Sequence, residues 1–258
     1  MTPSMRPPET STARDGCPAD CLGCGQSPHR KAWRTRWACA LYKRTSLPLR
    51  LAFTAIAHLR NRHPAEVLDT NPNVLDPYIH SHAQYTRQAF WEYGYHRVFS
   101  LVSNLHLTRH PASLNLLSIG PRTEIELYYL WLLFGFRWKN LTGADLISTS
   151  AKIKLTDMSI HLPFEDNSFD VVLASHSLEK SRDPERTRDE IRRVGKPNAW
   201  ILVAGDRKTE GFQPRIHSQY FAGGVYGFID SYQLETRDIE YLNARSPHGY
   251  EVIFRNRK

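Results

Sequence analysis

The sequence predicts an α/β fold, in which helices cover both faces of a mostly parallel sheet and a helical extension comes first. Two observations support this prediction. From about residue 111 onward, short apolar runs alternate with longer helix-like segments, and such alternation produces βαβ units. One of these runs, Val171-Val172-Leu173, shows no polar alternation, as expected of a strand buried on both faces. Hydrophobic residues make up 41% of the 258 residues, which is enough to form a core.

Short apolar runs place the strands of the predicted sheet. They span residues 114–119, 141–146, 153–156, 169–174, 200–204 and 250–255. A long apolar helix is expected after the first strand and stops near Gly135, and Thr123 and Glu126 at its start have the spacing of a capping box.

A second helix is expected over residues 183–194, because Asp183 suits an N-cap and Pro184 suits the first helical position. The chain then turns at Lys196-Pro197-Asn198, where Asn198 tolerates a left-handed backbone. These helix-start and turn signals do not depend on the apolar pattern, so they are a second line of support for the predicted order of helices and strands.

The sequence divides into three predicted parts. Residues 1–45 form a basic, cysteine-containing flexible tail without periodicity, and residues 46–110 form a helical extension or lid. The extension contains an amphipathic helix at 46–62, a connecting loop at 63–80 and an interrupted apolar stripe at 82–107. Residues 111–258 form the main α/β domain.

The net charge of +8 belongs to the start of the chain. Residues 1–63 contain eleven Lys/Arg and three Asp/Glu, whereas the rest carries 23 of each sign. This segment could contact nucleic acid, an anionic surface or an acidic partner, or could be a solvated tail. The longest apolar run, residues 127–136, has ten residues, and a transmembrane helix needs about 20. We therefore expect no transmembrane segment and, without a signal-peptide pattern, a cytoplasmic location.

All four cysteines lie in the tail. Cys17, Cys21, Cys24 and Cys39 could ligate zinc, with Cys39 as the fourth ligand. The first three also have a spacing used for iron–sulfur clusters, but the strands and helices of the matching barrel do not follow. Free thiols in a flexible tail are the preferred interpretation, and no metal is predicted.

Residues 153–204 carry several linked anchors. They are an LPF-acidic-D-x-S-FD segment before an apolar strand, an SLE turn, an RDP…EIRRV helix and a KP turn into another strand. This stretch resembles the central part of the type 11 class I S-adenosylmethionine (SAM) dependent methyltransferases. The resemblance implies a Rossmann-like three-layer sandwich with an antiparallel last strand, SAM as cofactor and methyl transfer as activity.

The resemblance also implies where the cofactor binds. The loop after the first strand wraps the methionine part of SAM, an acidic residue after the second strand binds the ribose hydroxyls, and one after the third meets the adenine. A carboxylate suits two vicinal hydroxyls because it accepts from both. The alternatives are a loop cap for the first acid and a turn former for the second. The predicted residues are Ser118, Gly120, Pro121, Arg122, Glu124, Asp145, Leu146, Asp157, Met158 and Ser175.

The first loop departs from the family pattern of an acidic residue followed by G-x-G-x-G. Ser118 replaces the acid, and only Gly120 remains of the three glycines, with Arg122 and Glu124 at the other two positions. In one interpretation Pro121 stiffens a slightly different loop that still binds SAM, with Arg122 near its carboxylate and Glu124 near its ammonium. In the other the pocket is closed. We favour the first, because both later acids are retained.

A general base is needed only if the methyl acceptor must lose a proton. His176 follows the fourth strand, where ligands bind in open α/β sheets, and is the predicted catalytic residue. The alternative is a loop histidine bonded to backbone. Asp206 and Arg207 follow the fifth strand and could bind an acceptor or cap the long loop 206–226, a candidate lid.

The sequence therefore predicts a SAM-dependent methyltransferase with a small-molecule acceptor. It contains no N-P-P-[Tyr/Phe] tetrapeptide of the kind that many nitrogen methylators carry. Two other functions remain open: a non-catalytic protein of this fold that docks a partner through its basic tail, and nucleic-acid methylation or binding through residues 1–63. The acceptor atom and the oligomeric state are not predicted.

Overall fold

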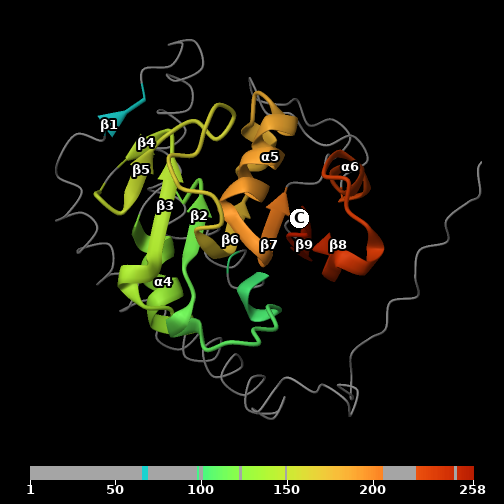
Figure 1. The fold of residues 1–258 in the computed structure, drawn as a ribbon, viewed down its shortest axis with the longest axis horizontal. Helices are drawn as coiled ribbons and strands as arrows, with labels where there is room; N and C mark the ends of the chain where they lie inside the picture. Colours follow the sequence, from blue (N-terminus) through green and yellow to red (C-terminus); the bar gives the residue numbers. More distant parts are fainter. Residues whose placement is uncertain are drawn as a thin grey trace, which may run out of the picture.

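A seven-stranded sheet forms the centre of the molecule in the computed structural model, which describes residues 66–68, 98, 101–121, 124–148, 150–205, 225–246 and 249–258 (Figure 1). The strand order is β5-β3-β2-β6-β7-β9-β8. The strands from β5 to β7 are parallel, and β9 runs antiparallel to both neighbours. The strands are β2 (Leu116–Ile119), β3 (Leu141–Asp145), β5 (Ile153–Leu155), β6 (Phe169–Ser175), β7 (Gly195–Gly205), β8 (Ile239–Ser246) and β9 (Gly249–Arg255).

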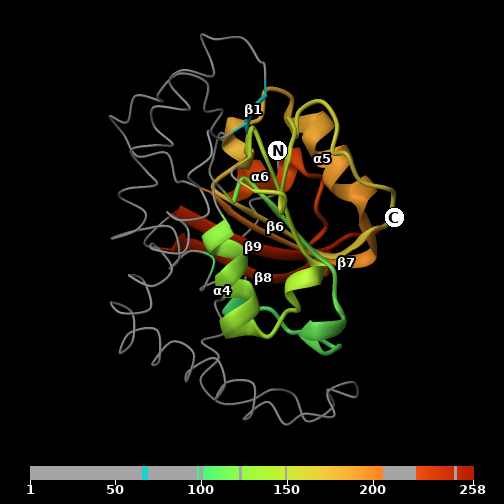
Figure 2. The same ribbon diagram turned by 90° about the vertical axis from the view of Figure 1, so that its left-hand side faces the viewer.

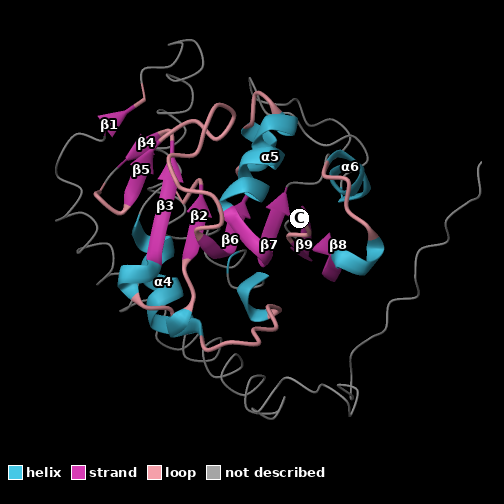
Figure 3. Cartoon of the chain, viewed as in Figure 1, coloured by secondary structure: helices cyan, strands magenta, loops and turns pink. Residues whose placement is uncertain are grey.

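Helices cover both faces of this sheet, as the view turned by 90° shows (Figure 2). Leu127 and Leu130 of α4 pack on one face, and Ile191 of α5 and Phe228 of α6 pack on the other. The predicted three-layer sandwich with an antiparallel last strand is confirmed. The helices are α4 (Glu124–Phe134), α5 (Pro184–Val194) and α6 (Val225–Ser231), with short 3-10 turns η1 (Pro111–Ser113), η2 (Trp138–Asn140), η3 (Leu178–Lys180) and η4 (Thr236–Asp238) (Figure 3).

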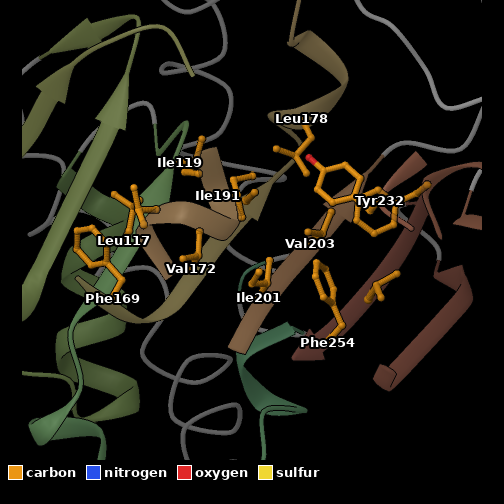
Figure 4. Packing of buried hydrophobic residues seen from close by; sticks show 14 of the residues in the cluster. Leu117, Ile119, Phe169, Val172, Leu178, Ile191, Ile201, Val203, Tyr232 and Phe254 are labelled. Atoms are coloured by element: carbon orange, nitrogen blue, oxygen red, sulfur yellow. The ribbon is translucent and has the colours of Figure 1, made fainter. Parts of the chain in front are cut away.

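The central strand β6 shows why the apolar runs lack alternation. Val171 and Leu173 belong to the core on the α4 side, and Val172 and Ala174 belong to the core on the α5 side. In Figure 4, Val172 lies with Ile201 and Ile191 in the second of these cores. Each buried aliphatic side chain contributes about 1.5 to 3 kcal/mol relative to exposure. The two cores together therefore fix the sheet between its helical layers.

The predicted helix ends agree with the structure. The Asp183 side chain accepts a hydrogen bond from the Arg186 amide at 2.9 Å, and Pro184 opens α5. Helix α4 ends at Phe134, and Gly135 follows with a φ of +77°. Thr123 of the predicted capping box lies outside the described residues.

Three elements differ from the expectation. Strand β7 starts at Gly195 rather than at residue 200, and the predicted turn persists as an irregularity within it, where Asn198 has a φ of +62°. Strand β8 and helix α6 were not predicted. Strand β8 lies at the edge of the sheet and mixes polar and apolar residues without a clear period. The expected loop 63–80 contains β1 (Glu66–Val67), which pairs with β4 (Ile147–Ser148).

Only part of the predicted extension is described. The apolar stripe 82–107 is visible in Val98, Leu101, Val102 and Leu105, all buried in the core on the α4 side. Among the described residues, no helix is both long and apolar enough to cross a membrane. The predictions for the four cysteines, the helix 46–62, Arg122, Asp206 and Arg207 fall outside the described part of the chain.

Candidate cofactor site

The predicted cofactor residues come together at the carboxyl-terminal edge of the parallel strands. Gly120 follows β2, Asp145 ends β3, Asp157 lies two residues beyond β5, and Ser175 ends β6. These four strands are consecutive neighbours in the sheet, in the order β5-β3-β2-β6. The sequence places these residues far apart, and the parallel topology gathers them at one edge, where open α/β sheets bind ligands.

Gly120 occupies the tightest point of this edge. Its φ is +72°, its amide donates to the Ala144 carbonyl at 2.8 Å, and a Cβ at this position would lie 2.6 Å from the Cβ of Ser177. Only glycine satisfies both the backbone conformation and the close approach. The loops after β2 and β6 therefore touch at Gly120, and Pro121 is buried beside them.

Two buried carboxylates lie in the first turn of α4. Glu124 and Glu126 are both buried, and Glu126 accepts a hydrogen bond from the Ser118 hydroxyl. Ser118 stands where the family commonly has an acidic residue, so Glu126 brings a carboxylate to the same place from the helix. From the sequence alone, Glu126 was expected only to cap the helix. The available signal was its position two residues beyond Glu124 in an otherwise apolar helix.

Asp145 is buried at the end of β3. Its Oδ1 accepts from the Ile147 amide at 3.4 Å, and its carbonyl accepts from the Thr156 amide at 2.8 Å. The Leu68 amide donates to the Leu146 carbonyl at 3.0 Å, beside the β1–β4 pairing. The segment that carries Asp145 is thus fixed by a neighbouring strand and by residues ahead of the main domain.

Asp157 begins the turn after β5. Its Oδ1 accepts from the Ser159 amide at 2.8 Å, and its carbonyl accepts from the amides of Ile160 and His161. The side chain therefore has the turn-forming role considered as its alternative. The same bonds hold a buried carboxylate at the sheet edge, so the turn-forming and binding roles are compatible.

His176 lies just beyond β6 with a φ of +55°, and its ring is 8% exposed. The His176 amide donates to the Ala204 carbonyl at 2.7 Å, which ties this loop to β7. The imidazole Nδ1 lies 3.9 Å from Oε1 of Glu179, which is also buried. From the sequence alone, Glu179 was expected only to form part of the SLE turn.

The residues at this edge suit a nucleoside-bearing cation. Asp145 can accept from both hydroxyls of a ribose, and the buried carboxylates of α4 favour a positively charged group nearby. The Ser177 hydroxyl is buried beside Gly120 and has no hydrogen-bond partner in the described part of the chain. A polar ligand at this edge would supply one. Among the described residues there is no His/Cys/Asp/Glu cluster that could hold a metal ion.

Residues 126–203 match the family model of the methyltransferase domain. A 2-phytyl-1,4-naphtoquinone methyltransferase of Trichormus variabilis is 33% identical over 66 residues, which cover 26% of this chain and 29% of that protein. The chain thus matches less than a third of the length of this curated relative.

Solved structures of similar topology share little sequence with this chain. A SAM-dependent methyltransferase from Aquifex aeolicus is 13% identical, with a TM-score of 0.44, and the match covers 57% of this chain and 84% of that one. A possible histamine N-methyltransferase from Thermotoga maritima is 14% identical, with a TM-score of 0.48, and the match covers 73% and 100%.

Residues 126–203 are thus similar to a methyltransferase domain, and the observed strand order agrees with the Rossmann-like fold expected of such a domain. This family implies SAM as the cofactor, and the acidic groups and the glycine at the sheet edge fit it.

Proposed function

We propose that this protein transfers a methyl group from SAM to a small-molecule acceptor. The observation that carries the proposal is the convergence of Gly120, Asp145 and Asp157 at the ends of adjacent parallel strands. Each of these residues is fixed by backbone hydrogen bonds, so the site is preorganised.

The assignment of roles follows the position of each residue. Asp145, followed by Leu146, would bind the ribose hydroxyls, and Asp157 with the Met158 amide would bind the adenine. Gly120 and Pro121, with Glu124 and the Ser118–Glu126 pair, would hold the methionine part. Ser175 lines the same edge at the end of β6. Arg122 belongs to this loop but lies outside the described residues, so its contact with the cofactor carboxylate remains a prediction.

When bound, SAM supplies an electrophilic methyl group for an in-line displacement. The protein then has to align the acceptor and exclude water, which accounts for a large part of the barrier in such reactions. His176 is the proposed base for an acceptor that must lose a proton. The neighbouring Glu179 carboxylate would stabilise the imidazolium that forms.

A small-molecule acceptor has one supporting observation. The curated relative is named as a methyltransferase of a naphthoquinone, and its similarity to this chain lies in a 66-residue segment. A reduced 1,4-naphthoquinone is therefore a sensible first acceptor to test. The partner of the basic segment 1–63 remains a prediction, since that whole segment lies outside the described residues.

The cofactor role of Asp145 is tested by Asp145→Ala. We expect the variant to bind S-adenosylhomocysteine at least about tenfold more weakly, because it loses charge-assisted hydrogen bonds to the ribose. Isothermal titration calorimetry of the full chain measures this. The matched control is Asp189→Ala, since Asp189 is 65% exposed on α5, and its affinity should equal that of the wild type. Equal affinities for both variants would contradict the assignment.

The role of His176 is tested by His176→Asn, because asparagine tolerates the positive φ of this position. We expect methyl transfer to a hydroxyl acceptor to fall by about 10²- to 10⁴-fold while affinity for S-adenosylhomocysteine is retained. Transfer of labelled methyl from SAM to the reduced naphthoquinone is the measurement, and His106→Asn, at an exposed position, is the control. An unchanged rate would remove His176 from the mechanism.

A further inference from the structure

Three buried hydroxyl groups connect the turn after β5 to helix α5. Ser159 Oγ lies 3.2 Å from Ser181 Oγ, and Ser181 Oγ lies 2.6 Å from Thr187 Oγ1. Thr187 Oγ1 in turn donates to the Met158 carbonyl at 3.3 Å. Thr187 is 0% exposed, so water does not compete for these bonds.

The direction of every bond in this chain follows from the last one. The Met158 carbonyl can only accept, so Thr187 donates its single hydroxyl proton there. Ser181 must then donate to Thr187, and Ser159 must donate to Ser181. The backbone amides supply the remaining bonds, from Arg182 to Ser159 at 2.9 Å and from Asp183 to Ser181 at 3.2 Å. Bonds that all run one way polarise and strengthen one another.

This chain of hydroxyls fixes the peptide unit between Met158 and Ser159. Its carbonyl accepts from Thr187, and its N–H donates to Oδ1 of Asp157 at 2.8 Å. A peptide unit is planar, so holding the carbonyl sets the direction of the N–H. The orientation of the Asp157 carboxylate therefore depends on the Thr187 hydroxyl, through the peptide unit that lies between them.

The same face of α5 anchors the rest of this loop. Thr187, Glu190 and Arg193 are spaced by three residues and lie along one side of the helix. The Leu162 amide donates to Glu190 at 2.7 Å, and Arg193 donates to the carbonyls of Leu162 and Phe164, each at 2.8 Å. Thr187 is the contact nearest to Asp157 along the loop, so its loss should affect the turn without releasing the whole segment.

We propose that Thr187, whose hydroxyl is oriented by Ser181 and Ser159, is a positioning residue that sets the Asp157 carboxylate for the adenine of the cofactor. This inference rests on the proposed function for the identity of the ligand. It gives a role to three hydroxyl side chains that do not themselves contact the cofactor. Thr187 touches no ligand and acts only through the Met158–Ser159 peptide.

The binding test compares Thr187→Val with Thr187→Ser. Valine keeps the shape and removes the proton donor, and we expect about a five- to tenfold weaker affinity for S-adenosylhomocysteine, the loss typical of one hydrogen bond. Serine keeps the donor and should restore most of the affinity. The control is Val194→Ala at the far end of α5, which lowers stability by removing buried apolar volume and should leave affinity unchanged.

A double-mutant cycle separates positioning from general loosening. In an Asp157→Ala background, Thr187→Val should have little further effect on affinity, because its target carboxylate is gone. Additive losses in the cycle would overturn the proposal, as would a Thr187→Val variant that binds like the wild type. Ser181→Ala interrupts the same chain and should lie between the wild type and Thr187→Val.

Amide hydrogen exchange tests the inference without any ligand. Thr187→Val should speed exchange of the Ser159 amide and of residues 156–162, whereas Val194→Ala should not single out this turn. If exchange is faster in Thr187→Val but the wild type binds no S-adenosylhomocysteine, the proposed function fails and the positioning role stands. Unchanged exchange would defeat the positioning role by itself.

Discussion

Gly120 illustrates how one residue joins two loops of the site. It combines a positive φ with an approach to Ser177 that leaves no room for a side chain. Arg122 and Glu124 replace the other two glycines of the family pattern. Gly120 is therefore the position of the pattern at which this contact requires glycine.

Gly120→Ala should lower stability by about 2 to 4 kcal/mol, combining the cost of a positive φ with that of overpacking. Urea unfolding followed by circular dichroism measures the loss. Gly135→Ala is the matched control, because Gly135 has a φ of +77° but no atom within 4 Å of an added Cβ. It should show only the conformational part of the cost.

The contact itself is tested by adding Ser177→Gly to the Gly120→Ala variant. Removing the Ser177 Cβ should recover the overpacking part of the lost stability, since that atom lies nearest to the added methyl group. A double variant as unstable as Gly120→Ala alone would show that the two loops do not meet as described.

At the scale of elements, helix α5 does more than cover the sheet. Its apolar side, with Ile191 and Val194, packs into the core, and its polar side holds the turn that carries Asp157. The sequence predicted the helix and both of its ends, because caps and periodicity are local signals. The hydrogen bonds from α5 to the turn could not be predicted, since Thr187 and Met158 lie 29 positions apart in the chain.

The same distinction between local signals and long-range contacts explains which parts of the site could be predicted. The positions of Asp145 and Asp157 follow from the strands that precede them, and the structure brings both to the predicted edge. The Ser118–Glu126 pair and the His176–Glu179 contact depend on how a helix or turn packs against the sheet. Strand β8 was missed for a related reason, because an edge strand needs no continuous apolar run.

At the scale of the whole molecule, Asp170 ties the amino-terminal edge of the sheet together. Burial disfavours its charge, but the Asn115 amide at 3.0 Å, Lys196 at 2.9 Å and Arg109 at 2.8 Å outweigh this, so the pKa of Asp170 lies below its ordinary value of 3.8. A carboxylate with a lowered folded-state pKa stabilises the protein above the pKa of the unfolded state. That contribution is lost as the pH falls through the folded-state pKa.

Asp170→Asn should therefore reduce the free energy of unfolding at pH 7 by about 1 kcal/mol or more, a modest value because Arg109 and Lys196 are partly exposed. The difference from the wild type should shrink once the pH falls below 3.8 and the wild-type carboxyl also becomes protonated. Urea unfolding of both proteins between pH 7 and pH 3 measures this. A difference that stays constant with pH would show that the charge of Asp170 is not what stabilises this edge.

The sheet edge should still bind SAM although its first loop keeps one glycine of three. Calorimetric titration of the full chain with S-adenosylhomocysteine tests it most directly. We expect one site with a Kd between about 1 μM and 1 mM, the range in which the KM values of enzymes commonly fall. The absence of any binding heat and of any rise in melting temperature at millimolar ligand would contradict the claim.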